Sequence, residues 1–313
     1  MTGAPDNIRK SRILALVGPT AVGKSEVALL LAEKTNGEII SVDSMQVYRG
    51  LNIGTAKPSQ DDRARVPHHL IDVVDLTTPF DVSQFLRLSN EAMALIERQG
   101  RLPILCGGTG LYFKAFFEGL GEAPGGDPAL RAELEAIPVS ELLRELAERD
   151  PASYEKIDRK NHRRVVRAME VIRLTGKPYS LQRAAWSQSS DQRLPIFGLL
   201  RSTADLHQRI EARVDAMFSH ALVREAEQLL KSGLAQNRTA MQALGYRQVV
   251  EHLRGVRSLA ETIALVKTRT RQFAKRQMTW FRRQMPVHWI QVGPEQPADQ
   301  IAAKVYEQFF VSS

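Results

Sequence analysis

Residues 18–25, with the sequence Gly-Pro-Thr-Ala-Val-Gly-Lys-Ser, combine the residue types that bind a phosphate group. Two glycines with four residues between them, followed by Lys24 and Ser25, have the spacing of a phosphate loop. In such a loop, backbone N–H groups at the start of a helix point at an anion, and the helix dipole favours negative charge there. Lys24 adds a positive charge, and the Ser25 hydroxyl can reach a Mg²⁺ ion. We therefore predict a phosphate site, with a glycine turn that binds nothing as the alternative.

Polar residues also follow two other predicted strands. Asp43 ends the apolar stretch 38–43, and the sequence Gly-Gly-Thr-Gly at 107–110 follows the apolar stretch 103–106. Ligands of open α/β sheets bind outside the carboxyl ends of the strands. If the strands before the phosphate loop and before Asp43 are neighbours, their ends lie about 4.8 Å apart. Asp43 then acts on whatever the loop holds; the alternatives are a turn-capping Asp43 and a plain tight turn at 107–110.

Two arginines on a predicted helix are further candidates for binding an anion. Arg209 and Arg213 are one helical turn apart and share a face. They either clamp phosphate oxygens or pair with neighbouring acids, and the spacing does not decide between these. The neighbouring acids are Asp205, Glu211 and Asp215.

Basic residues also gather in two stretches, at 159–173 and 267–283. The second contains no acid, and the opposite face of its predicted helix, with Phe273, Ala274, Trp280 and Phe281, is expected to pack inward. Two such stretches in a chain with a formal charge of +8 favour a polyanionic partner such as RNA. A solvated helix face is the alternative for each stretch. The adjacent pair His68 and His69 does not have the spacing of a metal site.

The elements that must position these residues follow from the hydrophobic pattern. Strands and helices alternate, which indicates a P-loop-type α/β fold: a parallel sheet with helices on both faces, plus a helical insertion domain. Asp81 or Ser83 is the expected cap of the second helix. The pattern predicts strands at 13–17, 38–43, 69–75, 103–106 and 196–200, and helices at 27–32, 85–96, 205–231, 258–283 and 298–310.

The length and composition of the chain limit its possible domain organisation. A chain of 313 residues with 43% hydrophobic content can form one large domain that carries a smaller one. We predict a loose leader at 1–12, a core domain at 13–128 and 196–313, and the insertion at 129–195. The single Cys106 excludes internal disulfides and cysteine-rich zinc sites. The chain has no run of eighteen apolar residues, so we expect a cytoplasmic protein that does not span a membrane.

Seven sequence segments together resemble the bacterial tRNA dimethylallyltransferase family, the isopentenyl transferases of tRNA. The resemblance extends from about residue 12 to residue 290. Val22, where the family often has Ser, is a small departure, and the insertion matches less closely. The matching segments are 18–25, 40–48, 52–58, 107–112, 209–215, 244–248 and 271–281.

The resemblance implies transfer of a dimethylallyl group from its diphosphate to N6 of the adenosine just 3′ of the anticodon, with Mg²⁺ as cofactor. Diphosphate would bind at Thr20, Ala21, Val22, Gly23, Lys24 and Ser25, with Ser25 as the metal ligand. Asp43 would be the base, and Thr20 and Arg213 would complete the catalytic set. The anticodon stem-loop of tRNA would contact Asp43, Ser44, Met45, Gln46, Thr109, Arg131, Arg163, Arg164, Val165, Val166, Arg167, Gln242, Ala243, Leu244, Gly245, Tyr246 and Arg247 of a monomer.

Two other functions fit parts of the sequence. A small-molecule kinase would use the same phosphate loop, with residues 159–164 as its lid, and would bind ATP. A non-catalytic RNA-binding protein would keep the loop as a relic, but it would not need Asp43, Thr109 and Arg213 to converge on Lys24.

Overall fold

The computed structural model describes residues 13–182 and 196–311. The chain divides into two compact units, the first formed by Met1–Lys114 with Asp191–Ser313 and the second by Ala115–Ser190. The predicted leader at 1–12 and residues 183–195 of the predicted insertion lie outside the described residues. Within the described ranges, no helix is both long enough and apolar enough to cross a membrane.

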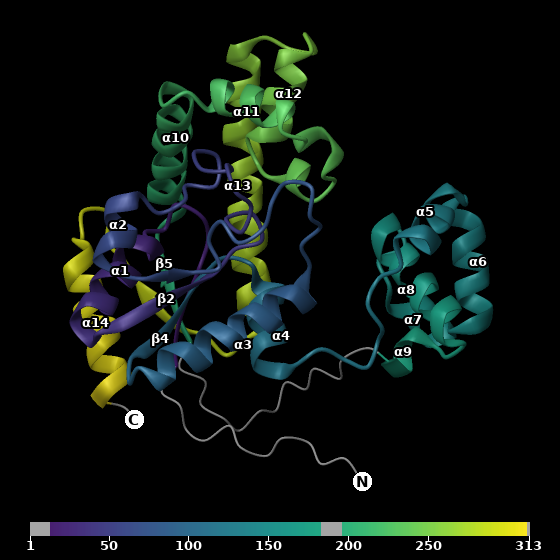
Figure 1. Cartoon of the computed structure of the whole chain (residues 1–313), viewed down its shortest axis with the longest axis horizontal. Helices are drawn as coiled ribbons and strands as arrows, with labels where there is room; N and C mark the ends of the chain where they lie inside the picture. Colours follow the sequence, from purple (N-terminus) through teal and green to yellow (C-terminus); the bar gives the residue numbers. More distant parts are fainter. Residues whose placement is uncertain (1–12, 183–195, 312–313) are drawn as a thin grey trace. The chain divides into compact units, whose positions relative to one another are not determined.

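The first unit is built on a parallel sheet in which the strand order differs from the chain order. The order is β3-β2-β4-β1-β5-β6, and every pairing is parallel. The crossovers between parallel strands are made by helices, as Figure 1 shows for α1, α3 and α10. The strands are β1 (Leu14–Val17), β2 (Gly37–Val42), β3 (His68–His69), β4 (Leu102–Gly107), β5 (Ile196–Leu200) and β6 (His288–Gln291).

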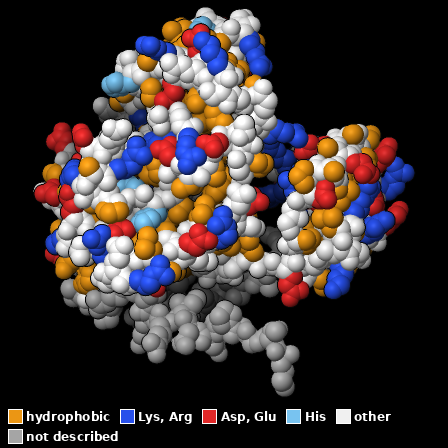
Figure 2. All heavy atoms as spheres, in the orientation of Figure 1, with side chains coloured by type: hydrophobic (Ala, Val, Ile, Leu, Met, Phe, Trp, Pro, Cys, Tyr) orange, Lys and Arg blue, Asp and Glu red, His pale blue; other side chains and the backbone are white. Residues whose placement is uncertain are grey.

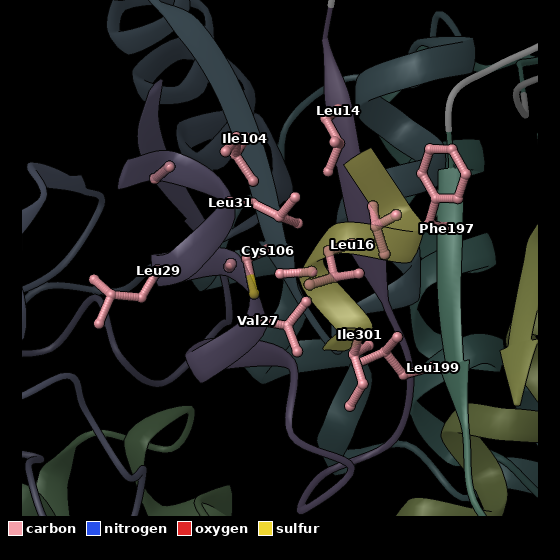
Figure 3. Packing of buried hydrophobic residues seen from close by; sticks show 14 of the residues in the cluster. Leu14, Leu16, Val27, Leu29, Leu31, Ile104, Cys106, Phe197, Leu199 and Ile301 are labelled. Atoms are coloured by element: carbon pink, nitrogen blue, oxygen red, sulfur yellow. The ribbon is translucent and has the colours of Figure 1, made fainter. Parts of the chain in front are cut away.

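One face of this sheet is covered by α1 (Lys24–Thr35) and α14 (Ala298–Val311). Alternate residues of each strand point to this face, and Leu14, Leu16 and Ile104 meet the helix side chains there without contact to solvent (Figure 3). Burial of this apolar surface supplies most of the driving force for folding the unit. The helix that follows the phosphate loop is therefore fixed firmly on the sheet.

The other face is covered by α3 (Val82–Arg98), which packs against β2 and β4. Asp81 caps α3 by accepting a hydrogen bond from the Gln84 N–H, so of the two expected caps it is Asp81 that acts. On α13 (Leu259–Gln284), Phe281 packs edge-on against Phe113 of α4 (Gly110–Glu118). Helices on both faces confirm the predicted α/β class. The remaining helices of this unit are α2 (Gln60–Arg65), α10 (Thr203–Ser219), α11 (Leu222–Lys231), η1 (Leu234–Gln236), η2 (Ala240–Gln242) and α12 (Tyr246–Leu253).

Two element predictions for this unit are wrong, and one strand was not predicted. The predicted strand 69–75 is reduced to β3, because Leu70 and Asp72 adopt positive φ angles of 62° and 56° and interrupt the extended backbone. The predicted helix 205–231 is two helices, α10 and α11, separated at Ala221, which has a φ angle of 71°. Strand β6 was not predicted, since a four-residue edge strand leaves little periodicity to detect.

The second unit is a small helical bundle. Its core is formed by Leu134, Leu142 and Leu146 packed against one face of α8. The predicted all-helical character of this segment agrees with the described residues. The helices are α5 (Pro128–Ala136), α6 (Val139–Arg149), α7 (Pro151–Lys156), α8 (His162–Thr175) and α9 (Tyr179–Gln182).

The break between α10 and α11 gives a test with matched substitutions. Ala221 has the left-handed backbone that costs an L-residue about 1–2 kcal/mol. We expect Ala221→Gly to raise the free energy of unfolding by about 0.5–1 kcal/mol, because glycine relieves this strain. Ala216 is exposed within α10, and we expect its replacement by Gly to lower the free energy of unfolding by about 1 kcal/mol. Urea denaturation of the two variants should therefore shift in opposite directions, and a shift in the same direction would contradict the origin of the break.

Candidate active site

The polar segments that follow β1, β2 and β4 begin side by side at the carboxyl ends of these strands. Val17 of β1 and Val42 of β2 are both in register with Gly107 of β4. The phosphate loop follows Val17, and Asp43 follows Val42. The predicted convergence at one edge of the sheet is therefore present. The condition that β1 and β2 are adjacent strands is not met, because β4 lies between them, and their ends are separated by two strand spacings, about 10 Å.

The phosphate loop has the backbone that its glycines allow. Gly18 and Gly23 have φ angles of 141° and 106°, which favour glycine, and α1 begins immediately afterwards at Lys24. The Nζ of Lys24 donates a hydrogen bond to the Pro19 carbonyl at 2.7 Å. Val22 is fully buried, so its side chain packs in the core and the departure from Ser leaves the loop's ligand-facing side unchanged.

Two arginine side chains donate hydrogen bonds to carbonyl groups of the phosphate loop. The Nε of Arg201 donates to the Val22 carbonyl at 2.9 Å, and the Nε of Arg209 donates to the Ala21 carbonyl at 2.9 Å. Arg201 is 7% exposed and was not among the predicted site residues, although it directly follows the predicted strand 196–200. With these carbonyls occupied by donors, the loop's other N–H groups can face an anion, except that of Thr20, which donates to Gln277.

The acids on α10 have other partners than Arg209 and Arg213. Asp205 pairs with Arg201 at 2.9 Å, while Glu211 and Asp215 pair with Arg271 and Lys267 of α13. Among the described residues no ion pair involves Arg213, which lines the cavity in front of the phosphate loop. Burial holds the pKa of its guanidinium below the ordinary value, and the charge of Asp43 opposes this shift. An anion in the cavity would compensate this buried charge.

The cavity in front of the phosphate loop has a volume of about 100 Å³ and is open to solvent at its mouth. Its wall is polar at the phosphate loop, and toward β2 and β3 it combines apolar residues such as Ile39 and Ile71 with polar ones. On β2, alternation places Ile39, Ser41 and Asp43 on the same face as Cys106 of β4. The lining residues used below are Thr20, Lys24, Ser25, Ala28, Ile39, Ser41, Asp43, Gln46, Ile71, Cys106, Gly108, Arg213, Phe273 and Gln277.

Asp43 both caps a turn and faces the cavity. Its Oδ1 accepts hydrogen bonds from the Met45 N–H at 2.8 Å and the Gln46 N–H at 3.2 Å. Among the described residues, no group donates a hydrogen bond to Oδ2. The turn is braced by Thr109, whose hydroxyl oxygen accepts from the Ser44 N–H at 3.3 Å. The carboxylate is therefore held in a fixed orientation with one oxygen available, as a general base requires.

Burial changes the acid–base behaviour of two groups beside Asp43. Desolvation is the main cause that lowers the pKa of the Lys24 ammonium to about 8; Arg213 acts in the same direction, whereas Cys106 and Asp43 oppose the shift. Burial raises the pKa of the Cys106 thiol to about 11. Cys106 is thus a neutral thiol at pH 7 and not a nucleophile. The charge of the Lys24 ammonium therefore depends on pH near neutrality and on a bound anion.

Residues predicted to meet RNA near α12 have two kinds of surroundings. Gln242 and Arg247 are exposed, whereas Ala243 and Tyr246 are buried. The Tyr246 hydroxyl donates to Glu225 at 2.5 Å and accepts from the Gly54 N–H at 3.1 Å, so it ties the loop 52–58 to α11 and α12. Packing against protein surrounds the side chains of Ala243 and Tyr246, and their contact with RNA stays a prediction.

Gln46, from the same predicted set, also has structural partners. Its Oε1 accepts from the Ser41 hydroxyl at 2.8 Å, and its Nε2 donates to the carbonyls of Thr55 and Ala56 at 3.2 and 3.3 Å. Gln46 therefore joins the end of β2 to the loop at 52–58. Its wall of the cavity has a fixed shape as a result.

In the second unit, too, some of the predicted RNA-binding residues have partners within the protein and others are exposed. Arg131 and Arg167 both bind the buried carboxylate of Glu170, at 2.7 and 2.6 Å, and hold its pKa below the ordinary value. Val165 and Val166 lie in the core of this unit, and their contact with RNA stays a prediction. Arg163 and Arg164 are exposed on α8.

The basic stretch on α13 is only partly available to a polyanion. Lys267 and Arg271 are engaged with acids of α10, as described above. Lys275, Arg276, Arg282 and Arg283 are exposed. On the face of the molecule shown in Figure 2, Lys and Arg side chains are interspersed with Asp and Glu side chains. Of the face expected to pack inward, Ala274 and Phe281 are buried, while Phe273 lines the cavity.

The histidine pair is not arranged as a metal site. His69 Nε2 lies 2.6 Å from the buried carboxylate of Glu38, and His68 Nδ1 lies 2.7 Å from the Val66 carbonyl. In the described ranges no group of three or more His, Cys, Asp or Glu side chains could hold a metal ion.

An all-parallel α/β sheet with a glycine-rich loop between its first strand and first helix defines a phosphate-loop protein. Comparison with known sequences narrows this class. The family model described as IPP transferase matches residues 46–284, and a model described as isopentenyl transferase matches residues 11–71. The chain belongs to the IPP transferase family.

Individual relatives cover nearly the whole chain. The tRNA dimethylallyltransferase of Geobacter metallireducens is 46% identical over 287 residues, which are 90% of this chain and 93% of the relative. The structure of the tRNA isopentenylpyrophosphate transferase of Bacillus halodurans is similar with a TM-score of 0.68 and 39% identity, covering 97% and 99% of the two chains. A eukaryotic dimethylallyltransferase described as acting on tRNA has a TM-score of 0.77 at 27% identity, covering 96% and 79%. None of these matches supports the kinase alternative.

The lowered pKa of Lys24 predicts how anion binding depends on pH. As the pH rises through about 8, the free protein loses the Lys24 charge, whereas a bound anion would keep it. We expect the affinity for inorganic diphosphate to fall above pH 8, by up to about tenfold per pH unit. Titration calorimetry between pH 7 and 9.5 measures this dependence.

The variant Lys24→Met is the control for this measurement. It retains the loop and the pH-dependent ionisation of diphosphate itself, but it has no side-chain charge to lose. The difference between the two pH profiles isolates Lys24, and parallel profiles would contradict the expected linkage.

Proposed function

We propose that this protein transfers a dimethylallyl group from dimethylallyl diphosphate to N6 of the adenosine that lies 3′ of the anticodon in tRNA. The observation that carries the proposal is one cavity that a carboxylate, Asp43, and two cations, Lys24 and Arg213, line together. Family membership supports the same reaction, since the relatives bear this activity in their names. The family match, and not the carboxylate alone, favours this reaction over a kinase, since kinases also hold an Asp near the transferred phosphate.

The proposed step forms a bond from adenine N6 to C1 of the dimethylallyl group and breaks the bond from C1 to the diphosphate oxygen. The N6 proton passes to the free oxygen of Asp43, because an exocyclic amine becomes acidic only as the new bond forms. Diphosphate leaves with the electron pair of the broken bond. Lys24, Arg213 and the loop's N–H groups stabilise the charge that develops on it.

Thr20 and Ser25 complete the proposed diphosphate site. Both line the cavity beside Lys24. Mg²⁺ is usually bound through one or two protein oxygens together with substrate phosphates, and the exposed hydroxyl of Ser25 is a donor of that kind. When bound, Mg²⁺ would neutralise charge on the leaving diphosphate.

The apolar part of the cavity suits the five-carbon group. Ala28, Ile39 and Ile71 line the wall beyond the phosphate loop, and Phe273 lies on the side of α13. The target adenine must leave its stack to reach Asp43, which requires flipping of the base into the cavity. We propose that exposed residues of α8, Arg163 and Arg164, and of the α12 region, Gln242 and Arg247, bind the anticodon stem-loop. Action as a cytoplasmic monomer remains part of the same hypothesis.

Replacement of Asp43 by Asn tests the proposed base. Asn keeps the shape and the turn-capping oxygen, but it cannot accept a proton at neutral pH. With both substrates saturating, the single-turnover rate should fall by roughly 10²–10⁴, while both affinities stay within several-fold of wild type. Mass analysis of digested tRNA measures the added five-carbon unit.

Lys24→Ala is the contrasting variant, because Lys24 meets charge in the ground state and in the transition state alike. It should weaken diphosphate binding as well as slow the reaction. If Asp43→Asn reacted at close to the wild-type rate, Asp43 would only cap its turn and the proposed base would be wrong.

Arg164→Ala tests the contact of α8 with RNA. If Arg164 binds one phosphate, the variant should bind tRNA more weakly, and the log–log slope of affinity against salt should fall by roughly 0.7–0.9. Arg144→Ala is the matched control, since this exposed arginine of α6 belongs to the same unit but not to the proposed contact set. An equal effect of both variants would indicate non-specific charge attraction.

A further inference from the structure

The side chain of Gln277, on α13, joins two of the three segments that form the site. Its Oε1 accepts a hydrogen bond from the Thr20 N–H in the phosphate loop at 2.9 Å. Its Nε2 donates to the Gly108 carbonyl, just after β4, at 3.0 Å. The residue is 8% exposed, so water does not readily replace either bond. One planar amide thus satisfies two backbone groups that come from different strand ends.

The space around this amide is closely fitted. A Cβ atom added to Gly108 would lie 2.2 Å from Gln277 Nε2, far below van der Waals contact. The absence of a side chain at Gly108 is therefore what lets the amide enter. Within the described residues, this is the side chain that bridges the phosphate loop and the glycine-rich turn through hydrogen bonds.

The bridge extends from Gly108 to the proposed base. Thr109 is the next residue, and its hydroxyl oxygen accepts from the Ser44 N–H, beside Asp43. The Thr109 N–H in turn donates to the Val42 carbonyl at 3.2 Å. Since β4 separates β1 from β2, the distance between the phosphate loop and Asp43 is set through this turn.

We infer that Gln277 is a positioning residue, which fixes the distance between the leaving diphosphate and the proton-accepting carboxylate. The inference rests on the proposed function. It also assigns the Thr20 N–H to Gln277, so that Thr20 meets the diphosphate through its hydroxyl group. An amide is required at this position because it offers a donor and an acceptor together, whereas a carboxylate offers only acceptors.

Three variants test this role, with kcat and KM for both substrates as the readout. Gln277→Met keeps the volume and removes both bonds. We expect kcat to fall by about tenfold or more while each KM stays within about threefold, as for loss of alignment in the transition state. Thr270→Val is the control on the same helix, since the buried Thr270 hydroxyl bonds only the Val266 carbonyl within α13. It should leave kcat unchanged.

Gln277→Glu adds a signature that a purely structural role lacks. When ionised, the introduced carboxylate repels the Gly108 carbonyl, and when protonated it donates to it. Burial raises the pKa of such a carboxyl group. The ratio of kcat for Gln277→Glu to kcat for wild type should therefore rise as the pH falls from 9 to 6, and the same ratio for Gln277→Met should not.

Gly108→Ala displaces the amide without changing Gln277. If both variants act through the same bridge, the double variant Gly108→Ala, Gln277→Met should be no more than about threefold slower than the slower single variant. Hydrogen–deuterium exchange of the peptide covering residues 18–25 should be faster in Gln277→Met and unchanged in Thr270→Val.

The outcomes separate this inference from the proposed function. A wild-type protein that transfers no dimethylallyl group would refute the proposed function, and the exchange experiment would still decide whether the bridge exists. An active wild type with unchanged kcat in folded Gln277→Met, an equal loss in Thr270→Val, or a ratio for Gln277→Glu that does not vary with pH would overturn the positioning role.

Discussion

The arrangement of this site depends on the register of three parallel strands. Hydrogen bonding between β1, β4 and β2 places Val17, Gly107 and Val42 at the same level. A shift by one residue would turn every side chain of a strand to the opposite face of the sheet. Ile39 and Asp43 would then leave the cavity, and Cys106 would leave the core beneath α1. The phosphate loop and the carboxylate face one another because this register is fixed by burial on both sides of the sheet.

The charges of the site are prepared before any ligand binds. Arg201 and Arg209 occupy carbonyl groups of the phosphate loop, which leaves the loop with N–H groups and the positive end of α1 toward the cavity. Lys24 and Arg213 are held near one another, and the cost of burying both charges appears in their lowered pKa values. Groups held in this way need little rearrangement when negative charge develops, which is the physical basis of electrostatic catalysis.

Several of the predicted site residues also stabilise the fold. Tyr246 ties the loop 52–58 to α11, and Arg131 and Arg167 neutralise the buried carboxylate of Glu170. In the proposed reaction Asp43 combines two roles in one side chain, since one oxygen caps a turn and the residue also lines the cavity. Removal of such residues changes shape and chemistry together, because a buried polar group without its partner is costly.

The sequence by itself determined the local features of this protein. Spacing of glycines, Lys24 and Ser25 identified the phosphate loop, and hydrophobic periodicity identified the α/β class, strand β5 and the long helix α13. These features depend on residues near one another in the chain. The shortening of β3 and the break at Ala221 escaped prediction, because neighbouring segments override local preference there.

Only the tertiary structure decided which segments became neighbours. The position of β4 between β1 and β2 follows from crossovers across the sheet, for which the sequence carries no local signal. The same holds for Gln277, which meets Thr20 across 257 positions of the chain, and for the acids of α10, which are bound by Arg201 and by α13 rather than by Arg209 or Arg213. A polar side chain forms hydrogen bonds and ion pairs with the groups that lie close to it in space. Which groups lie close is decided only when the sheet and its helices pack together.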